Sequence, residues 1–546
     1  MSRVVVIGAG VGGLAVAIRL AQDGHQVVVH ERSGVVGGKL GVHERDGYRF
    51  DTGPSLLTLP QVFEDLELGL DTERLDPVVR HVFPDGTVLD SSADHDVFLT
   101  RIADVLGPAA ADDWAAFWVR AERIWAASWG PVLQQPVTAA TLLRLSWRLG
   151  DLRAIAPGTS LRALGRRYLR DHRLRMLLDR YATYTGTDPR RAPAALAAIP
   201  YAELAFGGWY LPGGLGTIAS ALAARARALG VEIVLDSPVA AITVSGGRVS
   251  GVRLARPPVA GLPPPTAADS LPLTAADSPP LTAADSFPPP TATDSPPPAP
   301  ADLTPDSLPP APADLTPDSL PLVPADFVVS NVDALTTYRD LLPTPGRLGR
   351  LADRSLAGFV LLLGVRGETP ALAHHTVFFP RDYDAEFDAI FGDPGRGRRA
   401  RPAGDPAVFV TRANDPAVRP SGREAWFVLV NAPPHGTGGN AVDWRRPGLP
   451  EAYRDRILAV LAARGLDVRD RLEFAEIRTP ADLASATGAP GGSIYGTAGG
   501  LLRPPNRGPV PGLHLVGGST HPGGGLPMVT LSARIVAGQI AADRRR

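Results

Sequence analysis

The 546-residue chain contains no cysteine and a single lysine, Lys39. The absence of cysteine excludes disulfides, thiolate metal ligands, cysteine nucleophiles and dithiol redox chemistry. Of the 55 basic residues, 54 are arginine, so Schiff-base chemistry has one candidate residue. The formal net charge is −1, and no overall field therefore favours nucleic acid as a partner.

Long apolar runs are also missing. The longest, 356–365, is far shorter than the ~18 residues that suggest a membrane-spanning helix. The N-terminus starts with a strand pattern and lacks the charged-then-apolar layout of a secretion signal. We therefore expect a protein that is cytoplasmic or peripheral to a membrane. Hydrophobic residues make up 44% of the chain, enough for a large core, and the length allows about three domains.

One segment differs in composition from the rest of the chain. Residues 256–324 hold 22 of the 56 prolines, together with repeats of Thr-Ala-Ala-Asp-Ser and Asp-Leu-Thr-Pro-Asp-Ser-Leu-Pro. Proline opposes helices and strand ladders, and a segment so poor in aromatic residues cannot form a core. Because strand patterns flank the segment at 248–254 and 325–331, we expect a disordered insert in a surface connection inside one domain.

Residues 94–200 are rich in alanine, leucine and arginine at helical spacing. Four tryptophans fall on one face of a single predicted helix: Trp114, Trp118, Trp125 and Trp129. That face either packs in the core or contacts lipid or an apolar substrate. The arginines that follow, from Arg144 to Arg170, suit an anionic bilayer surface, although a solvated helical face has the same composition.

The N-terminal residues carry a complete nucleotide-binding pattern. A buried strand at 4–7 runs into Gly8-Ala9-Gly10-Val11-Gly12-Gly13, an apolar helix follows over 14–22, and a second strand at 26–30 ends at Glu31. This is G-x-G-x-x-G in its strand–helix–strand setting, which predicts dinucleotide binding.

Each residue of this pattern has a physical role. Gly8 makes the tight turn, Gly10 lets the backbone approach a pyrophosphate, and Gly13 lets helix and strand pack closely. The helix N-terminus offers free N–H groups and the positive end of its dipole to the phosphates. Glu31 can accept hydrogen bonds from an adenosine ribose, and its charge argues against the 2′-phosphate of NADP.

A second glycine pair, Gly37-Gly38, is followed by Lys39. This suits a second approach to the pyrophosphate with a cation beside it. Lys39 taken alone could be a surface residue, but in this run we favour a phosphate contact.

The spacing from Glu31 to Gly37-Gly38-Lys39, with Asp51-Thr52-Gly53-Pro54 after it, resembles the superfamily of flavin-containing amine oxidases and phytoene desaturases. The C-terminal run 511–532 closely resembles the closing motif of bacterial carotenoid desaturases. Three internal stretches match as well: 181–186, 209–215 and 325–331. The resemblance covers almost all of the chain except the insert.

The resemblance implies FAD as the cofactor and an α/β fold. That fold comprises a Rossmann-type FAD-binding domain, a mixed-sheet substrate domain and a helical subdomain, to which this chain adds the disordered insert. The resemblance implies the following cofactor-binding residues: Gly8, Gly10, Gly13, Glu31, Gly37, Gly38 and Lys39 for diphosphate and ribose, Val239 for adenine, and Gly518, Ser519 and Met528 for the ribityl chain and flavin ring. Many relatives carry an acid where this chain has Ser519, so its hydroxyl or backbone N–H groups must make that contact.

The expected domain order follows from the same comparison. The FAD-binding domain takes 1–93, 201–255, 325–340 and 506–546; the helical, substrate- or membrane-facing subdomain takes 94–200; the insert takes 256–324; and the substrate-binding domain takes 341–505.

A flavin beside an apolar cavity accepts a hydride from a C–H bond, and a desaturase must also remove a proton from the neighbouring carbon. His521 lies in the flavin motif and has a suitable pKa, so it is the candidate catalytic base. The alternative is that it only packs or hydrogen-bonds there. No spacing of carboxylates and histidines completes a metal site, so we expect no metal.

Within the family, the C-terminal motif and the stretch 492–496 resemble late-acting enzymes more than phytoene desaturases. We therefore expect an FAD-dependent oxidoreductase of carotenoid biosynthesis that acts on CH–CH bonds of an acyclic carotenoid, most like the 1-hydroxycarotenoid 3,4-desaturases. Phytoene desaturase and carotenoid terminal-methyl oxidase remain alternatives. Amine oxidase and a non-enzymatic prenyl-carrier protein are rival classes. The expected location is the cytoplasm, attached peripherally to the inner face of the cell membrane, with no nucleic-acid partner.

Overall fold

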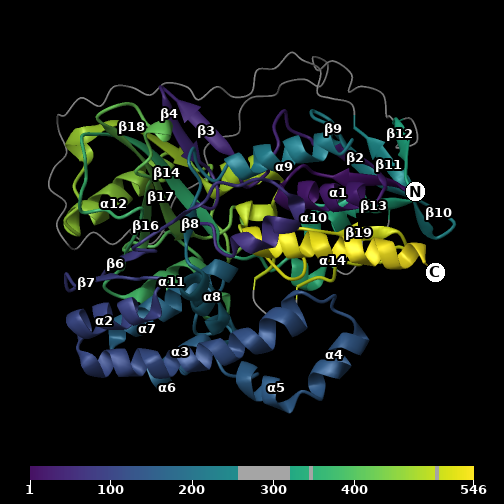
Figure 1. Ribbon diagram of the computed structural model, residues 1–546. Helices are drawn as coiled ribbons and strands as arrows, with labels where there is room; N and C mark the ends of the chain where they lie inside the picture. Colours follow the sequence, from purple (N-terminus) through teal and green to yellow (C-terminus); the bar gives the residue numbers. More distant parts are fainter. Residues whose placement is uncertain (256–319, 344–347, 499–502, 546) are drawn as a thin grey trace.

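The computed structural model describes residues 1–255, 320–343, 348–498 and 503–545 (Figure 1). Two large sheets lie side by side, and a layer of helices runs along one edge of both (Figure 1). The expected α/β fold with a helical subdomain is confirmed. Within the described residues, no helix is both long and apolar enough to cross a bilayer.

The N-terminal strand lies at the centre of a five-stranded parallel sheet with the order β19-β13-β1-β2-β9. Its strands are β1 (Arg3–Ile7), β2 (Gln26–His30), β9 (Glu232–Val234), β13 (Phe327–Ser330) and β19 (Leu513–Leu515). The valines of β1 are fully buried, as expected for a parallel strand covered on both faces.

Three helices cover one face of this sheet: α1 (Val11–Gln22), α9 (Thr217–Ala228) and α14 (Leu526–Arg544). The opposite face packs against a three-stranded antiparallel sheet made of β10 (Val239–Ser245), β11 (Arg248–Leu254) and β12 (Leu322–Pro324). Strands from four distant parts of the chain thus build one Rossmann-type unit.

Strand β12 corrects the predicted end of the insert. Leu322 pairs with Arg253 and Val323 with Val252, so the last three residues of the predicted segment 256–324 belong to a sheet. Leu322 and Val323 can adopt a strand conformation, and Pro324 lies at the end of the strand, where its missing N–H costs the sheet no interior hydrogen bond. The remainder of the prediction, disorder over 256–319, lies outside the described residues.

The second sheet has seven strands in the order β18-β14-β17-β16-β15-β6-β7 and is antiparallel except between β15 and β6. Its strands are β6 (Arg80–Val82), β7 (Val88–Asp90), β14 (Ala357–Arg366), β15 (His375–Phe378), β16 (Val408–Arg412), β17 (Arg423–Ala432) and β18 (Leu472–Arg478). Helix α12 (Leu449–Ala463) packs on one face. Strands β6 and β7 precede the predicted boundary at residue 93 but pair within this sheet, whose other strands the sequence assigned to the expected substrate-binding domain.

The helical layer contains α2 (His95–Leu106), α3 (Pro108–Ser128), the π-helical turn Trp129–Leu133, α4 (Ala139–Ser146), α5 (Leu149–Ile155), α6 (Leu161–Tyr168), α7 (His172–Arg180) and α8 (Ala198–Phe206). Shorter elements join the layers: β3 (Val42–Arg45), β4 (Tyr48–Asp51), β5 (Glu73–Arg74), β8 (Trp209–Tyr210), α10 (Ala334–Thr336), α11 (Tyr383–Phe391) and α13 (Pro480–Thr487).

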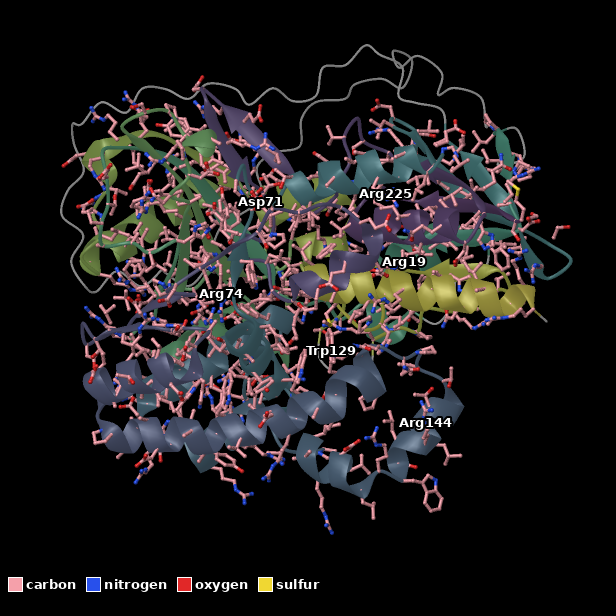
Figure 2. All side chains as sticks on the ribbon, in the orientation of Figure 1. Arg19, Asp71, Arg74, Trp129, Arg144 and Arg225 are labelled. Atoms are coloured by element: carbon pink, nitrogen blue, oxygen red, sulfur yellow. The ribbon has the colours of Figure 1, made fainter. Side chains whose placement is uncertain are left out.

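The tryptophan stripe on α3 is a packing surface. Trp114 is fully buried, and the ring of Trp118 stacks on His95 with centroids 4.6 Å apart. Trp125 stacks on Trp129 at 4.5 Å, where the helical layer meets the five-stranded domain (Figure 2). The structure shows packing for this face, with Trp114 in the core and the partly buried Trp118, Trp125 and Trp129 packed against it. A contact of the stripe with an apolar substrate stays a prediction.

Candidate active site

The turn between β1 and α1 forms a cradle that side chains would fill. Gly8 has a φ of +95°, and a Cβ added to Gly13 would lie 2.1 Å from the Gly8 carbonyl oxygen. A Cβ on Gly10 would lie 2.7 Å from Nδ2 of Asn331, a side chain of the segment after β13. The N-terminus of α1 therefore presents open backbone N–H groups, as a diphosphate site requires.

Glu31, at the end of β2, connects this turn to the adjacent strand. One carboxylate oxygen accepts the Ala9 N–H at 2.7 Å, and the other accepts the N–H and hydroxyl of Ser33 at 3.0 and 2.9 Å. The Ser237 N–H donates to the Glu31 carbonyl at 2.8 Å, and β10 begins two residues later at Val239. The predicted ribose and adenine residues thus lie along one edge of the parallel sheet.

The second glycine pair lies directly against the first. The Gly37 N–H donates to the Ala9 carbonyl at 2.9 Å, and a Cβ on Gly38 would lie 3.3 Å from the Gly10 Cα. The structure therefore brings together the two glycine motifs, which are separated by 24 residues or more in the sequence. Two backbone segments that approach this closely leave no space for side chains between them.

The Lys39 amino group lies in a polar environment inside the protein. Its Nζ donates to the carbonyl oxygens of Ser493 at 2.8 Å and Ile494 at 2.7 Å. Burial lowers the pKa of Lys39 to about 8. The interpretation of Lys39 as an ordinary surface residue is thus wrong, whereas its contact with a phosphate stays a prediction.

The loop from β19 to α14, residues 516–525, passes over the same region and is here called the C-terminal loop. A Cβ on Gly517 would lie 2.7 Å from Oδ1 of Asn331, and the Ser519 hydroxyl accepts the Ala334 N–H at 2.9 Å. The predicted flavin-contacting residues lie on this loop and in the first turn of α14: Gly518, Ser519 and Met528.

His521 joins the C-terminal loop to the helical layer. Its side chain is 1% exposed, and Nε2 lies 3.1 Å from the Val132 carbonyl oxygen and 2.9 Å from that of Gln135. Two carbonyl acceptors require a proton on Nε2, a tautomer inferred from these partners. Burial lowers the pKa of His521, so the ring is neutral at pH 7. The geometry matches the hydrogen-bonding alternative, and the catalytic role stays a prediction.

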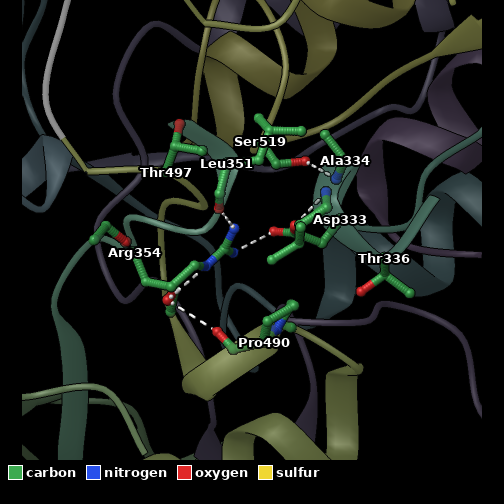
Figure 3. A network of polar contacts seen from close by, with 12 residues as sticks. Asp333, Ala334, Thr336, Leu351, Arg354, Pro490, Thr497 and Ser519 are labelled. Carbon is green, nitrogen blue, oxygen red and sulfur yellow. Dashed lines mark hydrogen bonds and ion pairs between the residues drawn. The ribbon is translucent and has the colours of Figure 1, made fainter. Parts of the chain in front are cut away.

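A buried ion pair lies beside the C-terminal loop and has no signature in local sequence. Arg354 Nη2 donates to Asp333 Oδ2 at 2.6 Å, one residue before Ala334 (Figure 3). Arg503, 149 residues further along the chain, donates to the Tyr495 carbonyl at 2.9 Å. Asn331 belongs to the stretch 325–331 that had a sequence signal, but Asp333, Arg354 and Arg503 had none.

A second buried polar cluster lies in the helical layer. Arg180 is fully buried and donates to Tyr184 OH at 2.8 Å and to Glu203 Oε1 at 3.2 Å. The hydroxyls of Tyr181 and Tyr184 also donate to Glu203, at 2.7 and 2.9 Å. These hydrogen bonds hold the stretch 181–186 in place through Tyr181 and Tyr184. Among the described residues, no group of three His, Cys, Asp or Glu side chains is placed to hold a metal.

Residues 11–259 match the family described as flavin containing amine oxidoreductase. The 4,4'-diapolycopene oxygenase of a Methylomonas species is 30% identical over 567 residues, which cover 99% of this chain and 98% of that protein. The chain belongs to the carotenoid desaturase and oxygenase family of flavin-containing oxidoreductases.

Other members of this family have different reactions. The 1-hydroxycarotenoid 3,4-desaturase of Flavobacterium sp. (strain P99-3) is 27% identical over 98% of both chains. The structure of an oxidoreductase from Methanosarcina mazei has a TM-score of 0.58 at 16% identity, covering 98% of this chain and 100% of that one, and shows the shared fold alone. The family predicted from the motifs is thus confirmed, and so is a flavin oxidoreductase class.

Proposed function

We propose that this protein binds FAD and uses it to remove hydrogen from an acyclic carotenoid. The observation that carries the proposal is the complete glycine cradle in a chain that matches a carotenoid oxygenase over nearly its whole length. In the proposed complex, the N-terminus of α1 binds the diphosphate, Glu31 binds the adenosine ribose, and the C-terminal loop holds the ribityl chain and ring. The bound flavin supplies a hydride acceptor.

We propose 3,4-desaturation of a 1-hydroxycarotenoid as the specific reaction. The resemblance of 492–496 and 511–532 to late-acting enzymes supports it, as does the full-length similarity to a 3,4-desaturase. Oxidation of a terminal methyl group is the second candidate, because the Methylomonas relative is an oxygenase. Phytoene desaturation is a third.

Product analysis separates these reactions. The gene is expressed in hosts that accumulate phytoene, a 1-hydroxycarotenoid or a C30 acyclic carotenoid. The pigments are then separated by chromatography, and their molecular masses are measured by mass spectrometry. A product that lacks two hydrogens, formed only from the hydroxylated substrate, supports the proposal. A product that gains oxygen at a chain end identifies a terminal oxidase and contradicts it.

Two rival classes make different demands on the site. An amine oxidase commonly holds a water with a lysine near the flavin, but the single lysine here donates to two backbone carbonyls. A prenyl carrier of this fold needs no flavin, whereas this chain keeps both glycine motifs packed together at the N-terminus of α1. The visible spectrum of the purified protein tests the second rival, since a carrier shows no flavin bands.

We further propose that the protein takes its substrate from the inner face of the cell membrane. A carotenoid is almost insoluble in water, so it must come from the bilayer. Helices α4 and α5 lie at the lower edge of the helical layer (Figure 1). Leu143, Trp147 and Leu149 are 62%, 78% and 65% exposed there, and Arg144 on α4 is exposed too (Figure 2).

Such a segment suits an anionic membrane surface. Exposed tryptophan and leucine side chains partition into the interface, and each nearby arginine adds about 1 kcal/mol on an anionic surface. The region 114–170 therefore remains the proposed membrane contact, with the exposed side chains of α4 and α5 in place of the tryptophan stripe, which packs against the core.

Co-sedimentation with phosphatidylcholine vesicles, with and without phosphatidylglycerol, tests this attachment. We expect Trp147→Ser to reduce binding to both vesicles, and Arg144→Glu to reduce binding only to the anionic ones. Val105→Ser, on the exposed side of α2, is the matched control and leaves binding unchanged. Equal sedimentation of all four proteins contradicts the proposal.

A further inference from the structure

Three cationic side chains from distant parts of the chain converge on one loop, residues 490–497. Lys39 reaches the loop from the second glycine motif through the two carbonyls named above. Arg503 donates from the other side to the carbonyls of Tyr495 and Thr497, and Arg503 is 8% exposed. These backbone carbonyls solvate the cations but bring no negative charge.

Arg354 is the third cation, and its contacts are visible in Figure 3. Its Nε lies 3.3 Å from the Ser493 hydroxyl, and Nη1 donates to the Leu351 carbonyl at 3.0 Å. Nη2 binds Asp333, and the two side chains are 8% and 5% exposed. One carboxylate therefore faces three cations, which leaves two positive charges uncompensated in this cluster of described residues.

The excess positive charge contributes to the lowered pKa values of Arg503 and Lys39. Burial and, after it, the charge of Arg354 lower the pKa of Arg503 to about 10 against the opposing effect of Asp333. Lys39 responds in the same way, with burial as the largest cause. Buried charges of one sign are costly unless an opposite charge offsets them.

The cluster lies directly beside the C-terminal loop. A Cβ on Gly496 would lie 2.8 Å from the Ser519 Cβ and 3.6 Å from Asp333 Oδ2. A Cβ on Gly524 would lie 2.6 Å from the Tyr495 ring. The loop that the cations hold is thus packed against the segment proposed to bind the flavin.

We propose that Lys39, Arg354 and Arg503 form a buried electropositive cluster that stabilises the reduced form of the bound flavin, with Asp333 limiting its strength. The inference rests on the flavin placement proposed above. A hydride from the substrate C–H bond brings two electrons and one proton to a neutral ring, and a second proton leaves the neighbouring carbon. The reduced ring gains one negative charge, which fixed positive charges favour.

The test measures the two-electron reduction potential of the flavin in purified holoenzyme, and the dissociation constant of sulfite, which also places negative charge on the ring. We expect Arg354→Gln to weaken sulfite binding about tenfold and to lower the potential by the equivalent of about 30 mV. Asp333→Asn shifts both in the opposite direction. The double variant removes one charge of each sign and returns both values close to wild type.

The double variant separates charge from packing. A displacement of the flavin would shift all three variants in the same direction, and this result would overturn the proposal. So would wild-type potentials in both single variants that retain flavin. If Arg354→Gln does not fold, Asp333→Asn still tests the proposal, because the proposal requires this variant to raise the reduction potential and to strengthen sulfite binding. A wild-type protein without flavin contradicts the proposed function itself, and the inference with it.

Discussion

At the scale of single residues, the glycines of the cradle are required for two different reasons. A Cβ on Gly13 would collide with the backbone oxygen of Gly8, which belongs to the same turn and cannot move away. A Cβ on Gly10 meets a side-chain atom of Asn331 instead. Gly13 is therefore required by the turn itself, whereas Gly10 is required by the close approach of the Asn331 side chain.

The first prediction concerns Gly10. We expect Gly10→Ala to weaken FAD binding at least tenfold and Gly10→Val to give apoprotein, because the added atoms occupy the path of the pyrophosphate. The flavin content of the purified protein and a titration of the apoprotein with FAD measure this.

Gly538→Ala is the matched control for this prediction. Gly538 lies inside α14, and nothing stands within 4 Å of an added Cβ. The control keeps full flavin content and gains up to about 1 kcal/mol of helix stability. Full flavin retention in Gly10→Val contradicts the placement of the diphosphate.

The second prediction concerns the pH dependence of cofactor binding through Lys39. Its pKa in the folded protein is about 8, below the ordinary value of 10.5, because burial disfavours the charged form. Between about pH 8 and 10.5 the lysine is mostly neutral in the folded protein but still protonated in the unfolded chain. The contribution of Lys39 to the free energy of unfolding therefore rises with pH over this range. An anionic cofactor favours the charged form, so FAD affinity falls as the pH rises above 8.

Fluorescence titrations of apoprotein with FAD from pH 7 to 9.5 measure this effect. We expect the affinity of wild type to decrease by up to about tenfold per pH unit above 8. Lys39→Arg keeps its charge over this range and gives a flat profile. Identical profiles for the two proteins would show that Lys39 does not interact with the cofactor.

At the scale of single elements, β11 and β12 show where the insert joins the fold. The Leu254 N–H donates to the Pro321 carbonyl at 3.0 Å, so the chain leaves and re-enters the sheet at neighbouring points. A short turn can therefore replace everything between them. We expect deletion of 257–319 with such a turn to leave flavin content and turnover near wild type.

A longer deletion provides the comparison. Removing 257–324 also removes β12 and exposes the edge of β11, so it lowers the thermal midpoint although only five more residues are lost. If the shorter deletion already costs flavin or turnover, the insert has a role in the folded protein and the prediction is wrong.

The elements that sequence predicts best are those with local patterns. The strand at 4–7, the glycine turn and Glu31 follow from spacing alone, and all are found where expected. No local pattern indicates that β6 pairs with β15, almost 300 residues away, or that β7 joins the same sheet through β6. The pairing of Arg354 with Asp333 is also a tertiary contact without periodicity, so no local pattern could indicate it.

At the scale of the whole molecule, the five-stranded domain and the helical layer meet at the C-terminal loop. His521 belongs to this contact, since it binds carbonyls of the turn after α3. Trp129, in the same turn, packs against the core of the five-stranded domain. The histidine is thus placed to hold the helical layer at a fixed distance from the C-terminal loop.

The fourth prediction separates the two roles of His521. In His521→Gln, the side-chain amide can still donate to the carbonyls but cannot serve as a base. If the histidine holds the loop, this variant retains flavin and most of its kcat, whereas His521→Ala loses about 1–3 kcal/mol of stability. A loss of kcat by a hundredfold or more in His521→Gln, with flavin content unchanged, would instead identify the base.

The most direct test of the proposed function mixes the purified protein anaerobically with a 1-hydroxycarotenoid in anionic vesicles and follows the flavin absorbance. We predict that the oxidised flavin band bleaches in a single turnover and that the extracted carotenoid lacks two hydrogens. Gly10→Val, without flavin, yields unchanged substrate. A flavin that stays oxidised with every acyclic carotenoid tested, or a carotenoid that gains oxygen when air is admitted but never loses hydrogen, would contradict the account.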